Sequence, residues 1–374
     1  MKILFLTPWY PDNKVSNHGI FIKEQAMAVA EENSVFLISS KIDYSKFRLF
    51  SWSVTESLSG NLKEFRIVIP RSLPIINQLN YFIISAYVSY KIGRAFNPQI
   101  VHGNIGYPGG FWSYCVSKIL GVPFIISEHY SRFKYNFRSP IHKFLTLFSM
   151  KRATRVLSVS SHSAEEIEGN INRSVDIVPN MIDVKRFSLK NNLDDSLQIG
   201  FLGSLDSDTH QKGLDLLLDA LKDFDLDFIL HVGGSGRYLN YYKTLTKEYG
   251  IESKCQFYGF IAYESIPVFM NKLHFFVSAS RFESFGIAMI EAMASGLPVI
   301  ATNSGGPKDF IKDFNGLMVE VNSAFAMQLA IQKMAHNLEK YKSEEIRSYI
   351  EENYDKENFK RQITEIYQES ILEK

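Results

Sequence analysis

Short apolar runs alternate with segments of helical periodicity along the whole chain, and this alternation constrains the fold more than any other feature. It is typical of parallel β-sheets that carry helices on both faces. The helical segments of the first half include Gly19–Ala30, Ile76–Phe96 and Ala164–Glu168. We interpret seven runs of this half as strands: Ile3–Thr7, Ser34–Ser39, Arg66–Ile69, Gln99–His102, Pro123–Ser127, Val156–Ser160 and Val175–Val178.

A polar stretch, Lys190–Ser196, interrupts the pattern, which then resumes. A length of 374 residues also indicates two domains. We therefore predict an α/β protein of two Rossmann-like domains, residues 1–185 and 190–355, that face a central cleft. Open sheets of this kind bind ligands at the carboxyl ends of their strands. The predicted strands of the second domain are Leu197–Leu202, Phe228–Val232, Cys255–Tyr258, Phe275–Ser278 and Val299–Thr302.

Charge is divided unevenly between the halves. Residues 1–187 hold 22 Lys+Arg and 13 Asp+Glu, whereas residues 188–374 hold 19 and 27, so the net charges are +9 and −8. This favours contact of the first half with an anionic surface, and the alternative is drift in surface composition.

The two cysteines, Cys115 and Cys255, have no metal-ligand spacing and fit a reducing cytosol. Because we find neither a signal peptide nor a long apolar run, we expect a cytoplasmic protein without a membrane span.

The segment 278–306 carries the strongest functional signal. A strand is expected to end near Ser280, Glu283 follows in a loop, and a helix is expected to begin near Ser284–Phe285 with Glu291 two turns inside it. Backbone N–H groups at a helix start suit an anion such as a diphosphate. The alternative is a simple loop carboxylate and a solvated helix glutamate. The N–H donors expected here are those of Phe285, Gly286 and Ile287.

With these residues the sequence resembles the retaining glycosyltransferases of family 4, which have the GT-B fold. The shared pattern is two glutamates eight positions apart around a Ser-Phe-Gly helix start (Ser284, Phe285, Gly286), followed by Glu-Ala-Met-Ala-x-Gly-x-Pro-Val. The resemblance implies that Glu283 contacts the donor sugar and that Glu291 holds the ribose hydroxyls. It also implies that the last helix, within 356–374, packs back on the first domain.

A second signal is the segment 203–213, in which Gly203 makes a turn after a strand and Lys212 precedes a helix. A lysine there can neutralise a diphosphate as a point charge, and the alternative is an exposed loop lysine. The family usually has an arginine directly after the glycine, where this chain has Ser204. Lys212 then acts alone, or His210 or another cation assists it.

Two further segments of the second half point to a nucleotide pocket. Leu230–Gly236 resembles the family strand that ends in Gly-x-Gly, and it lacks the third glycine of a dinucleotide fingerprint. We therefore favour a tight turn lining a nucleotide pocket over a dehydrogenase site. Cys255–Ile261 resembles the strand whose trailing loop contacts the base, which makes Ile261 a donor-binding candidate.

In the first half, Gly19 ends a long loop and opens a helix, and the family has a glycine here that lets donor phosphate and acceptor meet the backbone. His129 ends a strand and aligns with the active-site histidine of the family. His102 also ends a strand and is its competitor.

Two patterns allow more than one interpretation. Asp206-Ser-Asp208 and Asp225-Leu-Asp227 match the Asp-x-Asp pattern of metal-dependent glycosyltransferases, but so short a pattern is common, and we predict no metal. Arg132–Arg155 interleaves basic and aromatic residues. It is either an interfacial membrane segment or a core helix with a charged outer face.

Together these observations predict a retaining hexosyltransferase that uses a nucleoside-diphosphate sugar and no metal or other cofactor. Its acceptor would be a glycan or a lipid-linked glycan of bacterial surface polysaccharide synthesis, such as lipopolysaccharide or capsule. Peripheral contact with the anionic inner face of the cell membrane is expected, and no nucleic-acid partner. A GT-B-fold nucleotide-sugar epimerase and a nucleotide-binding protein without activity are the alternatives.

Overall fold

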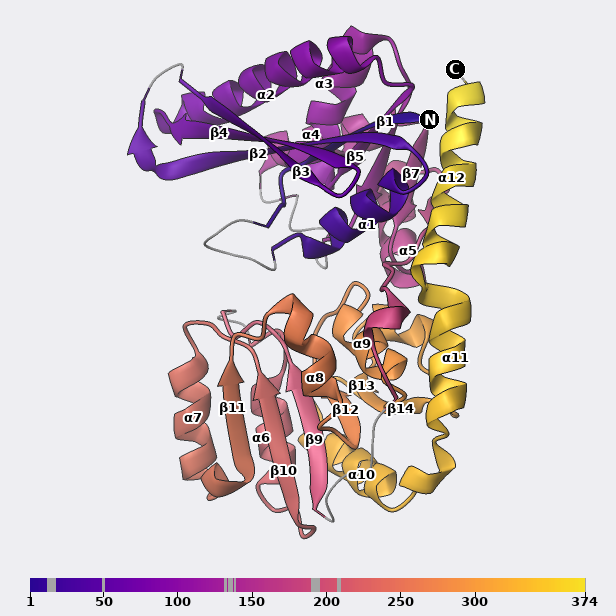
Figure 1. Cartoon of the computed structure of the whole chain (residues 1–374). Coiled ribbons are helices and arrows are strands. Elements are labelled where there is room, and N and C mark those ends of the chain that lie inside the picture. The colour runs from indigo at the N-terminus through magenta and orange to yellow at the C-terminus, as the bar shows by residue number, and fades with distance from the viewer. Residues whose placement is uncertain are drawn as a thin grey trace. The chain divides into compact units, whose positions relative to one another are not determined.

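The computed structural model describes residues 1–11, 18–48, 51–130, 133, 137, 139–189, 196–206 and 210–373. Most of the predicted boundary stretch, 190–195, lies outside these residues. The chain divides into two compact units, Met1–Asn180 with Phe359–Lys374, and Met181–Asn358. Each unit is built on a largely parallel sheet with helices on its faces, which confirms the predicted α/β fold class (Figure 1).

The first unit has an eight-stranded sheet in the order β3-β4-β2-β1-β5-β6-β7-β8. All neighbours are parallel except the hairpin of β3 and β4. The strands are β1 Lys2–Thr7, β2 Ser34–Phe47, β3 Ser53–Ser59, β4 Leu62–Arg71, β5 Ile100–Asn104, β6 Phe124–Glu128, β7 Arg155–Ser158 and β8 Asp176–Ile177. The helices are α1 Ile20–Ala30, α2 Pro74–Phe96, α3 Phe111–Leu120, α4 Pro140–Met150 and α5 Ser161–Ile171.

One layer of the first unit consists of α2, α3, α4 and α5, which pack on the same face of the sheet, whereas α1 lies on the other face (Figure 1). Trp112, Val116 and Met150 of this layer are buried against the strands. Burying such side chains is the main driving force for docking helices on a sheet. The polar strand β3, exposed along nearly its whole length, has no apolar run and escaped prediction.

The second unit has a six-stranded, wholly parallel sheet in the order β11-β10-β9-β12-β13-β14. Helices α6 and α10 cover one face, and α8, α9 and α11 pack together on the other. The strands are β9 Leu197–Leu202, β10 Phe228–Gly233, β11 Cys255–Gly259, β12 Phe275–Ser278, β13 Val299–Thr302 and β14 Gly316–Val319. The helices are α6 Leu214–Leu221, α7 Leu239–Glu248, α8 Ile266–Met270, α9 Ile287–Ala294, α10 Ala324–Ala335 and α11 Ser343–Tyr354.

The last helix, α12 (Lys356–Leu372), follows α11 and belongs to the first unit from Phe359 onward. Its buried face carries Phe359, Ile363 and Tyr367. The Tyr367 hydroxyl lies 2.7 Å from Nδ1 of His102 in β5. The end of the chain therefore completes the core of the unit that its beginning forms.

Candidate functional site

The sheet of the second unit reverses its strand order between β9 and β12. The chain leaves β9 toward β10 on one side and leaves β12 toward β13 on the other. In open α/β sheets, ligands bind outside the carboxyl ends of the strands at such a reversal. Two loops begin there, 203–213 after β9, described without 207–209, and 279–286 after β12.

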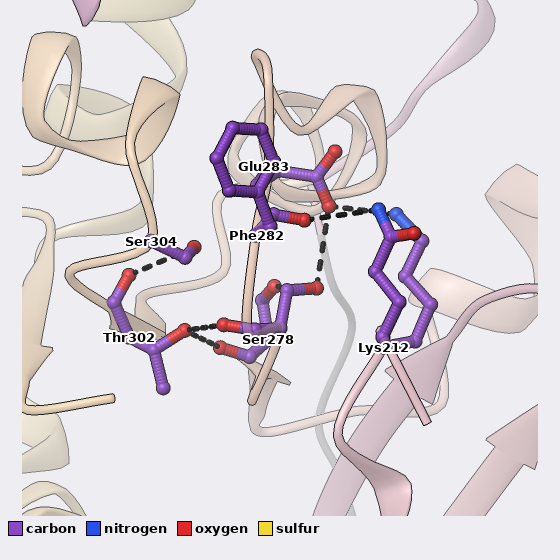
Figure 2. Close-up of polar contacts among 8 residues, drawn as sticks. Lys212, Ser278, Phe282, Glu283, Thr302 and Ser304 are labelled. Carbon is purple, nitrogen blue, oxygen red and sulfur yellow. Dashed lines mark hydrogen bonds and ion pairs between the residues drawn. The ribbon is translucent and has the colours of Figure 1, made fainter. Parts of the chain in front are cut away.

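An ion pair between Lys212 and Glu283 connects these two loops. The Lys212 ammonium lies 2.6 Å from Oε2 of Glu283, and the Ser280 hydroxyl donates to the same oxygen at 3.2 Å (Figure 2). The carboxylate is buried, whereas about a third of the lysine side chain is exposed (32%). A partly exposed cation held by a buried carboxylate is a fixed positive charge that a ligand can reach.

The backbone around Glu283 is fixed by the next loop. The Glu283 N–H donates to the Ser304 carbonyl, and the Gly306 N–H donates to the Glu283 carbonyl, each at 2.9 Å. The Thr302 hydroxyl donates to the Ser280 carbonyl (Figure 2 labels Thr302 and Ser304). Backbone pairing on both sides leaves the Glu283 side chain little freedom to leave the site.

Arg281 holds the other loop, and sequence reasoning missed it. Its guanidinium forms a bidentate ion pair with Asp215, at 2.9 and 2.7 Å, and donates to the His210 carbonyl at 2.7 Å. The partners are 66 residues apart in sequence, so no local motif could reveal the pair. Because Arg281 is engaged in this way, it positions the Lys212 loop and does not stand beside Lys212 as a second open cation.

Two other positions near Lys212, His210 and Ser204, were considered in the sequence analysis. Nδ1 of His210 lies 2.8 Å from the Tyr242 hydroxyl, and its ring is surrounded by aromatic side chains. Ser204, where the family has an arginine, is exposed at the loop tip. Of the candidates Lys212, His210 and Arg281, only Lys212 pairs with Glu283.

Helix α9 begins later than predicted, at Ile287 and not near Ser284–Phe285. Gly286 has φ 106°, a left-handed value that a helix interior does not allow, and it is the N-cap. Phe285 is buried, with its ring 5.5 Å from that of Phe310. Of the three predicted N–H donors, only Ile287 lies inside the helix. Ser284 is buried, as are its neighbours Glu283 and Phe285.

Glu291 is buried within α9, which excludes the alternative of a solvated helix residue. Burial raises the pKa of its carboxyl to about 8, and the charge of Arg186 opposes this shift. Arg186 itself donates to the Tyr263 carbonyl at 2.7 Å and stacks on the Tyr263 ring at 3.6 Å. Among the described residues, the Glu291 carboxyl has no hydrogen-bond partner. It is therefore a buried polar group whose hydrogen bonds a ligand could supply.

The glycine-containing segment after β10 packs against the loop after β9. The Gly203 N–H donates to the Gly233 carbonyl at 3.1 Å, and the Gly234 N–H donates to the Gly259 carbonyl at 2.7 Å. A Cβ at Gly234 would overlap the Gly203 carbonyl, so only glycine permits this approach. Ile261 contacts Gly233 at the same sheet edge. The structure thus brings Gly203, Lys212, Glu283 and Ile261 to the carboxyl edge of one sheet.

Gly19 and His129 belong to the first unit. Gly19 is the N-cap of α1 with φ 73°, and a Cβ there would overlap the Trp9 carbonyl. His129 directly follows β6, and its Nε2 lies 3.1 Å from Oδ1 of Asn104. Burial lowers the pKa of His129 to about 3, while a hydrogen bond from its ring to the Asn180 side chain opposes the shift. His129 is therefore neutral at physiological pH.

The carboxylate of Glu128 holds the loops around His129, and sequence reasoning missed it. It accepts three backbone N–H groups, from Gly106, His129 and Tyr130, each at 2.9 Å. Glu128 is almost completely buried. Because it joins the loop after β5 to the loop after β6, it fixes the backbone from which the His129 side chain projects.

The competitor His102 has a structural role. Its Nε2 lies 2.7 Å from the Ser127 hydroxyl and its Nδ1 lies 2.7 Å from the Tyr367 hydroxyl. Burial lowers the pKa of His102 to about 3, and the nearby His129 acts in the same direction. Both ring nitrogens are engaged between β5, β6 and α12, so His102 ties elements together.

The two short acidic patterns lie in different places, and Asp206 of the first pattern is in the same loop as Lys212. Asp225 and Asp227 precede β10, at the amino edge of the sheet, and Asp208 lies outside the described residues. In the described part of the chain, no three His, Cys, Asp or Glu side chains are grouped so that they could hold a metal ion. Nor does any described helix combine the length and apolarity that a membrane span needs. Of the predicted basic segment, Arg132, Lys134 and Arg138 also lie outside the described residues.

Comparison with known proteins agrees with this geometry. A family model described as glycosyl transferases group 1 matches residues 185–356, and one described as glycosyltransferase family 4 matches residues 47–186. The chain belongs to the GT-B glycosyltransferases of family 4.

Relatives and solved structures support the same assignment. An uncharacterized glycosyltransferase of Methanocaldococcus jannaschii is 26% identical over 294 residues, 78% of this chain and 80% of that protein. The lipopolysaccharide core biosynthesis mannosyltransferase LpsB of Rhizobium meliloti is 27% identical over 203 residues, 48% of this chain and 55% of that protein. Sucrose-phosphate synthase from Thermosynechococcus elongatus has the same fold, with a TM-score of 0.82, 18% identity and full coverage of both chains. Anabaena HepE in complex with UDP and glucose has a TM-score of 0.76 at 17% identity and covers 99% of this chain and 100% of its own.

Proposed function

We propose that this glycosyltransferase moves a hexose from a nucleoside-diphosphate sugar to a glycan or lipid-linked acceptor, with retention of the anomeric configuration, in bacterial surface polysaccharide synthesis. Family membership supports the reaction class. The name of one relative, a lipopolysaccharide core mannosyltransferase, supports the acceptor class. HepE, which shares the fold, is described with UDP and UDP-glucose bound, and this supports the donor class.

The observation that carries the proposal is the Lys212–Glu283 ion pair at the strand-order reversal of the second sheet. A departing nucleoside diphosphate develops negative charge, and a positioned ammonium lowers the barrier by stabilising that charge. In this proposal Lys212 pairs with the diphosphate. Glu283, already oriented by Ser280, then accepts from a hydroxyl of the donor sugar.

The rest of the donor would meet the groups around this pair. Glu291, buried and without a described hydrogen-bond partner, would bind the ribose hydroxyls. Gly203 and Ile261 would line the nucleotide site, and the N–H groups at Gly286 and Ile287 would face the phosphates. Since Ser204 replaces the usual arginine, Lys212 is the cation that we assign to the diphosphate.

In the first unit we assign the acceptor and one catalytic group. His129 would contact the reacting sugar as a neutral imidazole, since its pKa lies near 3. Glu128 would act as a positioning residue through the His129 backbone. Gly19 would let the substrate approach the start of α1.

A thermal-shift screen tests the donor assignment. Saturating UDP-, GDP-, ADP- and dTDP-sugars are added in EDTA, and the true donor class should raise the melting temperature by mass action. Glycosyl transfer with that donor should also persist in EDTA, because the proposed anion site uses a lysine and N–H groups. A shift or turnover that appears only after manganese or magnesium is restored would contradict metal independence, and isomerisation of the donor without acceptor would indicate an epimerase.

A further inference from the structure

The hundred residues from 65 to 164 hold twelve Lys and Arg but one acidic residue, Glu128. That carboxylate is almost completely buried and accepts three backbone N–H groups. It therefore presents no negative charge to a surface partner. The stretch includes β5, β6 and the helices α2, α3 and α4, and it ends just before Glu165, Glu166 and Glu168 of α5, which packs in the same core. A cationic surface that lacks acidic residues over such a length attracts anionic partners.

The cations of this layer point outward. Lys91 and Arg94 are exposed on α2, Lys118 on α3 and Lys143 on α4, with Lys151 and Arg152 directly after α4. The opposite side of the same helices forms the apolar core against the sheet. At the border of the layer, Glu56 of β3 is paired with Lys63 at 2.7 Å.

The same layer exposes large apolar side chains. Leu79 and Ile83 of α2 are 59% and 57% exposed, and Ile141 and Phe144 of α4 are 63% and 62% exposed. The Gln78 and His142 side chains, next to Leu79 and Ile141, lie 3.0 Å apart and bring the N-terminal parts of the two helices together. Exposing four large apolar side chains to water costs free energy. Apolar side chains among lysines suit the boundary of a lipid bilayer.

We propose that the outer face of α2, α3 and α4 docks on an anionic lipid bilayer. Leu79, Ile83, Ile141 and Phe144 enter the boundary between headgroups and acyl chains. The lysines and arginines of the layer bind lipid headgroups, whose negative charge complements them. A bilayer explains the apolar and the cationic residues together, whereas a soluble polyanion explains only the cationic ones.

The position of the apolar residues connects bilayer docking with the proposed reaction. α2 follows β4 and α4 follows β6, so both helices begin at the carboxyl edge of the sheet, where His129 lies. Ile141 is in the first turn of α4, and Leu79 is in the second turn of α2. A lipid-linked acceptor held in the bilayer would thus reach the edge that carries His129. This last step rests on the proposed function, whereas bilayer docking itself does not.

Vesicle co-sedimentation of the full chain tests the docking, with phosphatidylglycerol-containing and pure phosphatidylcholine vesicles compared at low salt. The wild type should sediment with the anionic vesicles alone. Neutralising Lys143, Lys151 and Arg152 to Gln together should lower its partition coefficient roughly 100-fold, since each basic residue contributes about a factor of five. Ile141→Ser with Phe144→Ser should remove the binding that remains at high salt.

Matched controls come from the second unit, where Phe325 and Leu329 of α10 are also exposed (70% and 48%). Phe325→Ser with Leu329→Ser should bind vesicles like wild type. Equal recovery of the wild type in the supernatant with both vesicle types would overturn the proposal. So would unchanged vesicle binding by the Ile141 and Phe144 variant together with tight binding to heparin, which would indicate a soluble polyanion. No nucleotide is present in these assays, so their failure leaves the donor site untouched.

Discussion

Glu291 shows how burial changes the chemistry of a single residue. The motif alone placed this glutamate on a helix, and the structure adds that it is enclosed and that its pKa is raised to about 8. At neutral pH such a carboxyl keeps its proton for much of the time. It can then both donate and accept hydrogen bonds, which suits a pair of ribose hydroxyls.

This pKa predicts a pH dependence of stability. A carboxyl with a raised folded-state pKa stabilises the fold fully below its unfolded value, and that stabilisation is lost as the pH rises through the folded value. Between about pH 5 and 8, the unfolding free energy of wild type should fall relative to Glu291→Gln by up to about 1.4 kcal/mol per pH unit. Urea unfolding at several pH values measures the difference, and parallel curves for the two proteins would contradict it.

At the scale of elements, the start of α6 depends on Gly213. Its φ is 70°, and a Cβ there would overlap the Ala279 carbonyl at the end of β12. Gly250 has nearly the same φ, 69°, with open space around it. A comparison of the two positions therefore separates the free-energy cost of a left-handed backbone from the cost of close packing.

Alanine at each position tests this distinction. Gly250→Ala should lower the unfolding free energy by about 1–2 kcal/mol through left-handed strain alone. Gly213→Ala should lower it by about 3–5 kcal/mol, because overpacking adds to the same strain. It should also displace Lys212 and weaken nucleotide binding. Equal losses in urea unfolding would show that the contact with Ala279 is unimportant.

Most strands with an apolar run could be predicted from the sequence. All twelve predicted runs coincide with strands, because buried parallel strands have near-continuous apolar sequence. The exposed edge strand β3 has no such run, and the edge strand β14 was missed although it carries a short one, Leu317–Val319. The predicted start of α9 is too early. The sequence after Glu283 is compatible with a helix, but the left-handed backbone of Gly286 lets the helix begin only at Ile287.

Some residues of the candidate site could likewise be predicted from the sequence, and others could not. Lys212 and Glu283 were recognisable from local motifs, and their meeting follows from the strand order. Arg281 with Asp215, and Glu128 with its three N–H donors, were not recognisable, because their contacts join loops that are distant in sequence. Sequence motifs thus indicate the residues that face a ligand better than those that hold them in place.

For the molecule as a whole, α12 links the end of the chain to the core of the first unit. Tyr367 is completely buried and meets His102, 265 residues earlier. Leu372, on the same helix, is 85% exposed. The integrity of the first unit should therefore depend on its last helix.

Tyr367→Ala should lower the unfolding free energy of the first unit by about 3–5 kcal/mol, the usual loss for a large buried aromatic side chain. Leu372→Ala should change it by less than about 0.5 kcal/mol. Hydrogen exchange followed by mass spectrometry can locate the effect. Amides of β5 should exchange faster in Tyr367→Ala while those of β9 stay protected, and equal acceleration in both sheets would contradict this assignment.

Calorimetric titration of UDP, GDP, ADP and dTDP into wild type, Lys212→Ala and Lys222→Ala tests the donor site most directly. Lys222 is an exposed lysine at the far end of α6, paired with Asp219, and serves as the control. One nucleoside diphosphate should bind wild type and Lys222→Ala alike. Its binding to Lys212→Ala should be at least roughly tenfold weaker, as expected for a lost charge-assisted contact. Equal affinity in all three proteins, or no binding of any of the four nucleotides, would contradict a donor site at the Lys212–Glu283 pair.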